Sequence, residues 1–318
     1  MSGRIAATAR LATSTAAERR LAEFGVVFVT LVWASNFIVV KSAIMVLPPI
    51  GMSAIRFGLA ALVLLALLRW REGTVRLPVR DLAAMGVVGI LGFGVYQVLW
   101  ATGLQGITAG DSALLIAATP VLTALFAVVA GSDTLTPLKL AGALVSFAGV
   151  GIVVVGGQGL GLGGVLLGYV LTLGAAVCWA LYTSFGAPIL RRHSPLRTTA
   201  WAVTVGAGFL IVPGGAQLAT LDWSEVTAPV WAAVLYSAVL PVAFANVIVF
   251  HAVKLLGPTR ITAFQFLVPA FAVVLGALVL AEPIRPAQIL GGAVIVAGIL
   301  VTRAAGTRHG MPGRRRTA

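Results

Sequence analysis

The chain has 318 residues, of which 59% are hydrophobic and 10% are charged, and its mean hydropathy is +1.05. Because an average soluble domain has about 25% charged residues, this composition excludes a soluble protein for most of the chain. The formal net charge is +13, but the basic residues lie in short clusters between long apolar runs, which argues against a nucleic-acid-binding protein. Cys178 is the only cysteine, which excludes an intramolecular disulfide and a multi-cysteine metal site, and no cofactor is expected.

The first 22 residues form a tail rich in Ala, Thr, Ser and Arg, with no acidic residue before Glu18. This composition resembles an organelle transit peptide, but the segment has no apolar face, so a disordered cytoplasmic tail is predicted. No A-x-A-like site follows the first apolar run, so no cleavable secretory signal is predicted. The basic end of the chain, residues 304–318, is also interpreted as a cytoplasmic tail.

Ten runs are long and apolar enough to cross a bilayer, which takes about 20 residues of helix. They are predicted at residues 24–46, 51–68, 82–104, 112–130, 138–155, 165–185, 198–218, 230–253, 259–280 and 287–301. The predicted fold class is therefore an all-α integral membrane protein with ten transmembrane helices, and the lipid bilayer is its first expected partner.

The first predicted helix carries polar residues on the face that also holds its aromatic rings. Trp33, Asn36, Phe37 and Lys41 follow the i, i+3, i+4, i+8 spacing of one helical face. Lipid would not favour an amide and an ammonium group there, so Asn36 is predicted either to face substrate or to hydrogen-bond another helix. Lys41 is predicted to attract a substrate carboxylate, whereas Arg56 on the second helix is expected to snorkel to the membrane interface.

The third predicted helix repeats this pattern. Phe93, Tyr96, Gln97 and Trp100 lie on one face, and Asn246 in the eighth helix follows Gln97 by 149 residues. Two amides at equivalent depths suit opposite sides of a bound zwitterion, and the rings beside them suit an apolar group or a cation. The alternative for each ring is that it fills a packed helical core.

The later helices supply the remaining candidates for substrate binding. These are Trp179 and Tyr182 in the sixth helix and Phe264 and Gln265 in the ninth. Pro120 and Pro269 each remove a helical hydrogen bond near the middle of the membrane, so they are predicted either to act as hinges or to form kinks needed for packing.

The chain contains an internal duplication. The residue pairs that lie 149 positions apart are Pro120 and Pro269, Asp133 and Glu282, Pro137 and Pro286, Gly142 and Gly291, and Gly149 and Gly298. Trp33 and Trp179 are 146 positions apart, which indicates a small insertion or deletion between the repeats. The predicted units are a first five-helix repeat at 23–156, a Gly-rich external link at 157–164 and a second repeat at 165–303.

Counting basic residues predicts the orientation, because Lys and Arg collect on the cytoplasmic side. With both termini cytoplasmic, 19 of the 22 Lys and Arg residues lie inside, and only Lys41, Arg56 and Arg285 lie elsewhere. Each repeat has an odd number of spans, so the two repeats are predicted to be inverted around a central cavity. Exchange of conformations between inverted repeats gives alternating access to the two sides.

These features together resemble one known family. The motifs are Trp33-Ala34-Ser35-Asn36-Phe37 in the first helix and the pattern Pro120, Asp133, Pro137, Gly142, Gly149 with its echo Pro269, Glu282, Pro286, Gly291, Gly298. They resemble the EamA family of the drug/metabolite transporter superfamily over nearly the whole chain, and the aromatic central helices look most like the YddG-type amino acid exporters. The resemblance implies a ten-helix basket around a cavity and an inner-membrane exporter of amino acids and other small metabolites.

The distribution of acids bears on energy coupling. None of the nine acidic residues lies in the middle of a predicted span, whereas proton-coupled transporters commonly use an intramembrane carboxylate. Facilitative transport is therefore predicted, and a proton-coupled efflux carrier for drugs or other metabolites is the alternative.

Other classes of function are less well supported by the sequence. An enzyme is not expected, because the chain has no H-E-x-x-H motif, no paired acids in mid-span and no Ser and His together at membrane depth. A nonselective channel remains the alternative from another class. Small-xxx-small pairs such as Gly142 with Ser146 permit close helix packing, either within the monomer or in a homodimer.

Overall fold

The computed structural model describes residues 16–131, 133–157, 164–190, 192–256 and 264–309, and in these ranges every regular element is a helix. The helices of the first half are α2 (Ala16–Ala43), α3 (Pro49–Glu72), α4 (Val79–Gly89), η1 (Ile90–Val95), α5 (Tyr96–Gly106), α6 (Ala109–Ile116), α7 (Thr119–Val129) and α8 (Pro137–Gly156). Those of the second half are α9 (Gly164–Leu190), α10 (Pro195–Leu218), η2 (Trp223–Glu225), α11 (Ala228–Ala238), η3 (Val239–Phe244), α12 (Ala245–Leu256), α14 (Leu267–Leu280) and α15 (Pro286–His309).

The predicted spans correspond to these helices. In the described part of the chain, eight helices are long and apolar enough to cross a membrane. The other two predicted spans, the eighth and ninth, are occupied by the shorter apolar helices Ala228–Val242 and Leu267–Leu280. The third span is built from α4, η1 and α5, and the fourth from α6 and α7. The all-helical fold with ten membrane helices in two halves is confirmed.

Local sequence signals explain where several helices begin. Proline occupies the first turn of α3, α8 and α10, where its missing N–H costs nothing. The hydroxyl groups of Thr108, Thr136 and Ser194 cap α6, α8 and α10 by accepting from the backbone N–H three residues later. At its other end, α3 stops at Gly73, whose φ of 72° is a left-handed conformation that glycine adopts without strain.

The lengths of the elements locate the insertion between the repeats. Helices α3 and α10 both have 24 residues and begin 146 positions apart, at Pro49 and Pro195. The next loop has six residues in the first repeat, 73–78, and nine in the second, 219–227. This difference of three residues accounts for the change in spacing from 146 to 149 further along the chain.

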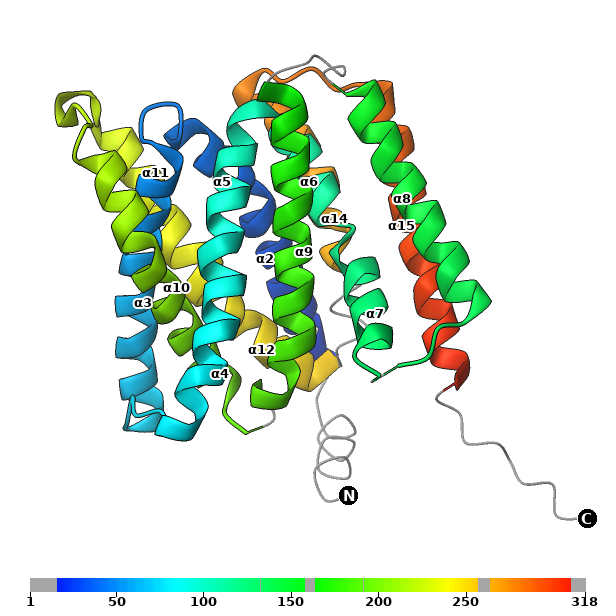
Figure 1. Ribbon diagram of the computed structural model, residues 1–318, viewed down its shortest axis with the longest axis horizontal. Helices are drawn as coiled ribbons and strands as arrows, with labels where there is room; N and C mark the ends of the chain where they lie inside the picture. Colours follow the sequence, from blue (N-terminus) through cyan, green and yellow to red (C-terminus); the bar gives the residue numbers. More distant parts are fainter. Residues whose placement is uncertain (1–15, 132, 158–163, 191, 257–263, 310–318) are drawn as a thin grey trace, which may run out of the picture.

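Contacts between α8 and α15 show that the repeats are related by a two-fold rotation. Gly142 packs against Gly298, and the equivalent contact, Gly291 against Gly149, is also present. Ser146 Oγ donates to the carbonyl oxygen of Ile295 at 3.3 Å, and these two residues are themselves 149 positions apart. The two helices run antiparallel and lie side by side at the right of Figure 1. The halves are therefore inverted relative to each other.

The same symmetry governs the centre of the molecule. Helix α2, the first of its repeat, packs against α12 and α14 of the second repeat. Its equivalent α9 packs against α5 and α7 of the first repeat, and α3 packs against α10. Figure 1 shows α2, α5 and α9 in the middle of the bundle, between the α3–α10 and α8–α15 pairs. Each repeat thus contributes its first helix to the other repeat's half of the bundle.

A pair of π-helical turns also follows the symmetry. The six-residue turns η1 and η3 begin at Ile90 and Val239 and end at Val95 and Phe244, 149 positions apart at both ends. Such turns leave backbone carbonyls outside the regular helical pattern and are frequent at functional sites. The sequence analysis did not predict them, and they directly precede the helices that carry Gln97 and Asn246.

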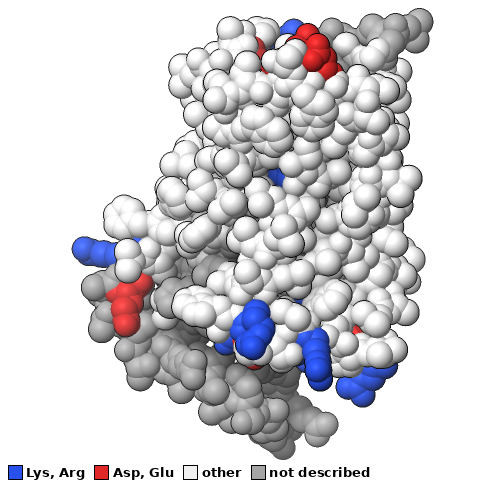
Figure 2. Space-filling model, turned by 90° about the vertical axis from the view of Figure 1, so that its left-hand side faces the viewer, with Lys and Arg blue, Asp and Glu red and all other residues white. Residues whose placement is uncertain are grey.

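Most charged side chains on the surface visible in Figure 2 gather toward the two ends of the bundle. In Figure 2 the Lys and Arg side chains gather mainly at the lower end, and a broad band with almost no charge separates them from the acidic group at the top. The lower end is the one at which α2 begins and α15 ends in Figure 1. A band of this kind is the surface that a lipid bilayer covers.

Candidate functional site

Seven aromatic rings from four membrane spans form a continuous cluster in the middle of the bundle. They are Phe37, Phe57, Phe93, Tyr96, Trp100, Trp179 and Tyr182. The second repeat contributes Trp179 and Tyr182, whose ring centroids lie 5.0 Å apart, and Trp179 lies 5.3 Å from Tyr96 of the first repeat. These spacings are typical of favourable aromatic pairs. Both Tyr96 and Trp179 are only half-buried.

A glycine in η1 makes the approach of the two repeats possible. A Cβ atom at Gly92 would lie 2.5 Å from the ring of Tyr182, so no other residue fits without displacing the tyrosine. The backbone of η1 therefore packs directly against the Tyr182 ring of the aromatic cluster.

A buried guanidinium joins two of the predicted polar residues. Arg56 on α3 donates to Gln97 Oε1 at 2.9 Å and to Asn36 Oδ1 at 3.3 Å. Its guanidinium carbon lies 4.7 Å from the Phe57 ring centroid and 5.6 Å from that of Trp100, within the range of cation–π attraction. We call Asn36, Arg56, Gln97 and the seven rings the amide-aromatic cluster.

The expectation that Arg56 snorkels to the interface was wrong. Its side chain is 2% exposed, and the amide oxygens of Asn36 and Gln97 draw it inward instead. Arg56 follows the start of α3 by seven residues, or about 10 Å of helix. The interface is therefore distant, whereas the two amides lie within hydrogen-bond distance of the guanidinium. The amides of Asn36 and Gln97, on helices that neighbour α3, were the signal from which the burial of Arg56 could have been predicted.

The other candidate residues lie at several positions around the bundle. Trp33 donates its indole N–H to the carbonyl oxygen of Pro241, inside η3, at 3.2 Å. Phe264 packs against the small apolar group of Ala22, Val26 and Ala252, away from the rings. Gln265 is half-buried, and the side chain of Asn246 on α12 lies outside the described part of the structure.

The polar contacts of Lys41 among the described residues lie outside the amide-aromatic cluster. Its ammonium group forms an ion pair with Glu282 Oε1 at 2.9 Å and donates to the carbonyl oxygen of Ile107. Glu282 also accepts the backbone N–H of Ala109, the first residue of α6, at 3.0 Å. The acid of the second repeat thus ties α2 and the start of α6, both in the first repeat, to the loop after α14. We call this set the upper latch.

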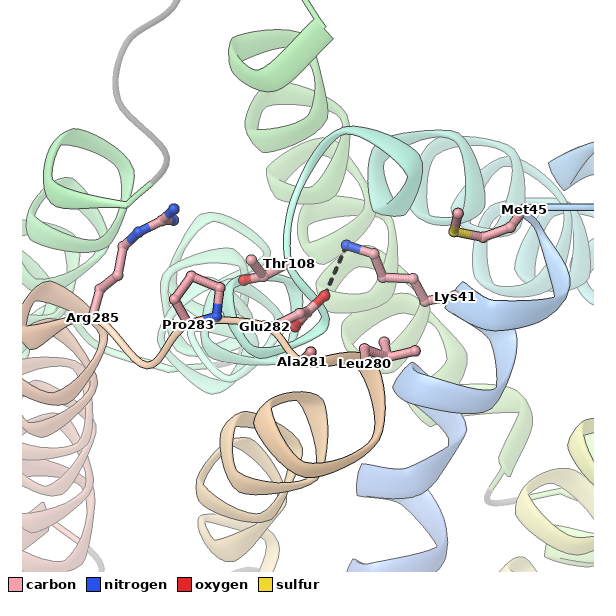
Figure 3. Close-up of a pocket in the computed structure, with 8 residues that line it drawn as sticks. All are labelled: Lys41, Met45, Thr108, Leu280, Ala281, Glu282, Pro283 and Arg285. Carbon is pink, nitrogen blue, oxygen red and sulfur yellow. Dashed lines mark ion pairs between the residues drawn. The ribbon is translucent and has the colours of Figure 1, made fainter.

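The upper latch borders a cavity of about 310 Å³. Figure 3 shows the Lys41 ammonium group pointing at Glu282, with Thr108 beside them and Arg285 directed away. Ala281, next to Glu282, has a left-handed φ of 53°, which is unusual for a residue other than glycine. This backbone turn brings the Glu282 side chain toward the first repeat.

A second buried acid, Asp111, follows Ala109 of the upper latch by two residues. Asp111 on α6 is fully buried and accepts from Tyr169 Oη at 2.7 Å and from Gln288 Nε2 at 2.8 Å. Gln288 also donates to Thr108 Oγ1 at 3.2 Å. This network again joins the first repeat to the second, at the end of the bundle that carries Glu282.

The opposite end has its own charged contacts. Asp81 at the start of α4 forms an ion pair with Arg192 at 3.0 Å and a hydrogen bond with His193 at 2.8 Å, and Glu72 pairs with Arg197 at 3.0 Å. These pairs tie the loop between the second and third spans to the loop between the sixth and seventh. The two repeats are therefore joined by polar contacts at both ends of the bundle.

The helices that carry Pro120 and Pro269 are interrupted near both prolines. The α6 and α7 segments are separated by Ala117 and Ala118, and Pro120 is the second residue of α7. Phe266 interrupts the helical turns three residues before Pro269. Since Ala117 and Phe266 are 149 positions apart, the break is a shared property of the two repeats.

Comparisons with known proteins agree with this geometry. The model of the EamA-like transporter family matches residues 20–155 and again residues 166–304. A probable terminal-alkyne amino-acid exporter of Streptantibioticus cattleyicolor is 31% identical, over 92% of this chain and 98% of that protein. An uncharacterized transporter of Archaeoglobus fulgidus is 29% identical, over 86% of this chain and 94% of that protein. A crystal structure with 20% identity superposes with a TM-score of 0.63 over 94% of this chain and all of that chain, which supports the fold.

Proposed function

Since this chain belongs to the EamA-like transporter family and is a membrane transporter rather than an enzyme, we propose that it exports amino acids and related small metabolites by alternating access. In this proposal the amide-aromatic cluster is the substrate site and borders the central cavity. The transport is facilitative, so the substrate gradient drives it.

The observation that carries the proposal is the convergence of predicted site residues from both repeats. Asn36, Tyr96 and Gln97 come from the first repeat and Trp179 and Tyr182 from the second, and ring and hydrogen-bond contacts connect them through neighbouring side chains. A site at the junction of inverted repeats is accessible from either side as the repeats exchange conformations. The composition of amides and rings suits a small zwitterion with an apolar side chain. The similarity of the chain to a probable terminal-alkyne amino-acid exporter supports the same class of substrate.

The upper latch and the broken helices suggest how the protein changes conformation. Opening the upper end separates Glu282 from Lys41 and from the Ala109 N–H. Pro120 and Pro269 then act as the hinges of the fourth and ninth spans, because each follows a break in its helix. Opening the lower end separates Asp81 and Glu72 from the loop at 192–197.

The orientation in the proposal follows from the basic residues. On the face shown in Figure 2, Lys and Arg side chains gather mainly at the lower end. In the proposal this end therefore faces the cytoplasm of a bacterial-type inner membrane, with both termini inside. Because Cys178 is the only cysteine and is buried, a Cys178→Ala background allows single-cysteine tests. A membrane-impermeant maleimide applied to intact cells should label Glu225→Cys and leave Arg76→Cys unlabelled. The reverse pattern would contradict the orientation.

Transport of a panel of radiolabelled amino acids, including L-phenylalanine and L-propargylglycine, into proteoliposomes tests the function directly. Saturable uptake that Gln97→Ala and Asn246→Ala both reduce is the expected result. Arg71→Gln, an exposed arginine on the same helix as Arg56, serves as the matched control and should transport normally. No uptake of any amino acid from either side by folded protein would reject the proposal in favour of drugs or other metabolites.

Proton-coupled efflux is the second candidate, because two acids lie in contacts between the repeats. Asp111 is fully buried, and the Glu282 side chain is 12% exposed. Protonation of Glu282 would remove its attraction for Lys41 and release the upper latch. Imposing a pH gradient in the same assay separates the candidates: an unchanged rate supports facilitative transport, and substrate-linked proton movement supports coupling.

A further inference from the structure

We infer that Arg56 and Trp100 of the amide-aromatic cluster, together with the neighbouring Ser53, form an anion site and that this site holds the carboxylate group of the substrate. The inference rests on the proposed function, because it names the chemical group that the proposed substrates share. It assigns the main charged contact to Arg56 rather than to Lys41, whose charge Glu282 already neutralises.

The first argument is the charge of Arg56. Its side chain is 2% exposed, and its two hydrogen-bond acceptors, Asn36 and Gln97, are neutral amides. None of the ion pairs found among the described residues includes Arg56. A buried charge is costly without a counter-ion. An anion from outside the protein supplies one.

The second argument is a set of buried donors without acceptors. Arg56 Nε, Trp100 Nε1 and Ser53 Oγ are all buried and make no hydrogen bond within the described structure. Ser53 precedes Arg56 by three residues, so both lie on one face of α3. The Trp100 ring lies 5.6 Å from the guanidinium carbon. Buried donors rarely stay unpaired. The free Nε–H of the guanidinium, the Ser53 hydroxyl and the Trp100 indole N–H are therefore suited to the oxygens of a carboxylate.

The surroundings define the class of ligand. One guanidinium balances one negative charge, so a carboxylate suits the site better than a doubly charged phosphate, for which several basic residues would be expected. The rings of Tyr96 and Trp179, 5.3 Å apart and half-buried, can contact the apolar or cationic remainder of the ligand. Asn36 and Tyr96 retain exposed surface, which marks the side from which the carboxylate reaches Arg56.

The test compares ligands that differ only in charged groups. The probes are L-phenylalanine, 3-phenylpropanoate, which lacks the amine, and L-phenylalaninamide, which lacks the carboxylate. Binding to purified protein is followed by tryptophan fluorescence, and radiolabelled L-phenylalanine uptake is measured in proteoliposomes. We expect the wild type to bind both carboxylates and to bind the amide at least ten-fold more weakly.

Two variants remove the site in different ways. Arg56→Gln removes the charge and should weaken both carboxylates about 30-fold or more, with little effect on the amide. Asn36→Asp places a resident carboxylate against Arg56 and should give the same loss of carboxylate binding, in a protein whose melting temperature is not lowered. Arg71→Gln again serves as the control and should bind all three probes like the wild type.

The outcomes separate this inference from the proposed function. If 3-phenylpropanoate binds through Arg56 but no amino acid is transported, the anion site stands and the proposed function fails. If L-phenylalanine is transported and neither Arg56→Gln nor Asn36→Asp reduces its uptake, the proposed function stands and the anion site is rejected. Equal weakening of the carboxylates and the amide in folded Asn36→Asp protein would assign Arg56 a purely structural role and also reject the site.

Discussion

The α8–α15 interface and the amide-aromatic cluster both join the two repeats inside the membrane, but they use opposite kinds of residue. At the interface, Gly142 and Gly149 bring two backbones together with no room for a side chain. In the cluster, a guanidinium, two amides and seven rings come together, and three donors in and beside it, one of them on Ser53, remain without acceptors.

The difference indicates a division of labour. A glycine contact gains its stability from close backbone approach and has no polar group left to satisfy. The cluster leaves donors unpaired, which is costly in the free protein and is useful where a ligand supplies the acceptors. Substitutions at the interface should therefore disturb folding first, and substitutions in the cluster should disturb binding first.

The largest effect is expected at the glycine interface. A Cβ atom at Gly142 would lie 2.6 Å from the backbone nitrogen of Thr302 and 2.7 Å from the carbonyl oxygen of Gly298. Gly142→Leu should destabilise the protein by about 3 kcal/mol or more, because backbone cannot move aside as a side chain can. The measurement is thermal unfolding in detergent with a thiol-reactive dye that reports the exposure of buried Cys178.

Gly151 provides the matched control on the same helix, since a Cβ atom there would meet nothing within 4 Å. Gly151→Leu should unfold at nearly the wild-type temperature. Equal loss of stability in both variants would mean that the bulk of leucine, rather than the contact between repeats, determines the effect.

The upper latch offers a third kind of contact between repeats, an ion pair whose side chains are 17% and 12% exposed. Lys41→Met and Glu282→Gln should each destabilise the closed upper end, and a double-mutant cycle should give a coupling of about 2 kcal/mol. The readout is the thermal midpoint of each single variant and of the double variant. Additive effects of the two substitutions would show that the pair contributes no coupling.

Within the cluster, Trp179→Leu should affect binding more than stability. The substitution removes ring contacts with Phe93, Tyr96 and Tyr182 and should weaken the apparent affinity for the transported amino acid about ten-fold. Concentration-dependent uptake in proteoliposomes measures the effect. A large fall in melting temperature with unchanged affinity would assign the ring to the packed core.

The smallest effect is expected for a single hydrogen bond between the repeats. Ser35 Oγ and Tyr236 Oη lie 2.6 Å apart, and Tyr236→Phe should cost about 1 kcal/mol of stability with normal transport. Ser35→Ala alone and with Tyr236→Phe completes the cycle. A transport defect in Tyr236→Phe would place this contact in the substrate path instead.

The repeated motifs were sufficient to predict the ten helices and the inversion, because a span needs a long apolar run and an odd number of spans reverses the second half. The faces of the first and third helices likewise predicted that Asn36 and Gln97 point inward. The partners of the charged residues could not be predicted in this way. Arg56 and Lys41 each lie near a helix end, where snorkeling and burial are both available, and only the packing of neighbouring helices decides between them.

The π-helical turns also escaped prediction, for a different reason. A π-turn adds one residue without changing the apolar character of a span, so hydropathy and helical spacing do not reveal it. In the sequence, the two π-turns are marked only by their equivalent positions, which lie 149 residues apart in the two repeats.

This agreement in position has an evolutionary consequence. The spacing of 149 holds at both ends of η1 and η3, so both repeats carry the π-turn at the same position, which favours a turn that preceded the duplication. The three-residue difference between the loops 73–78 and 219–227 arose afterwards. The two five-helix units therefore each place a π-turn directly before the helix that carries Gln97 or Asn246, at equivalent positions on the two sides of the bundle.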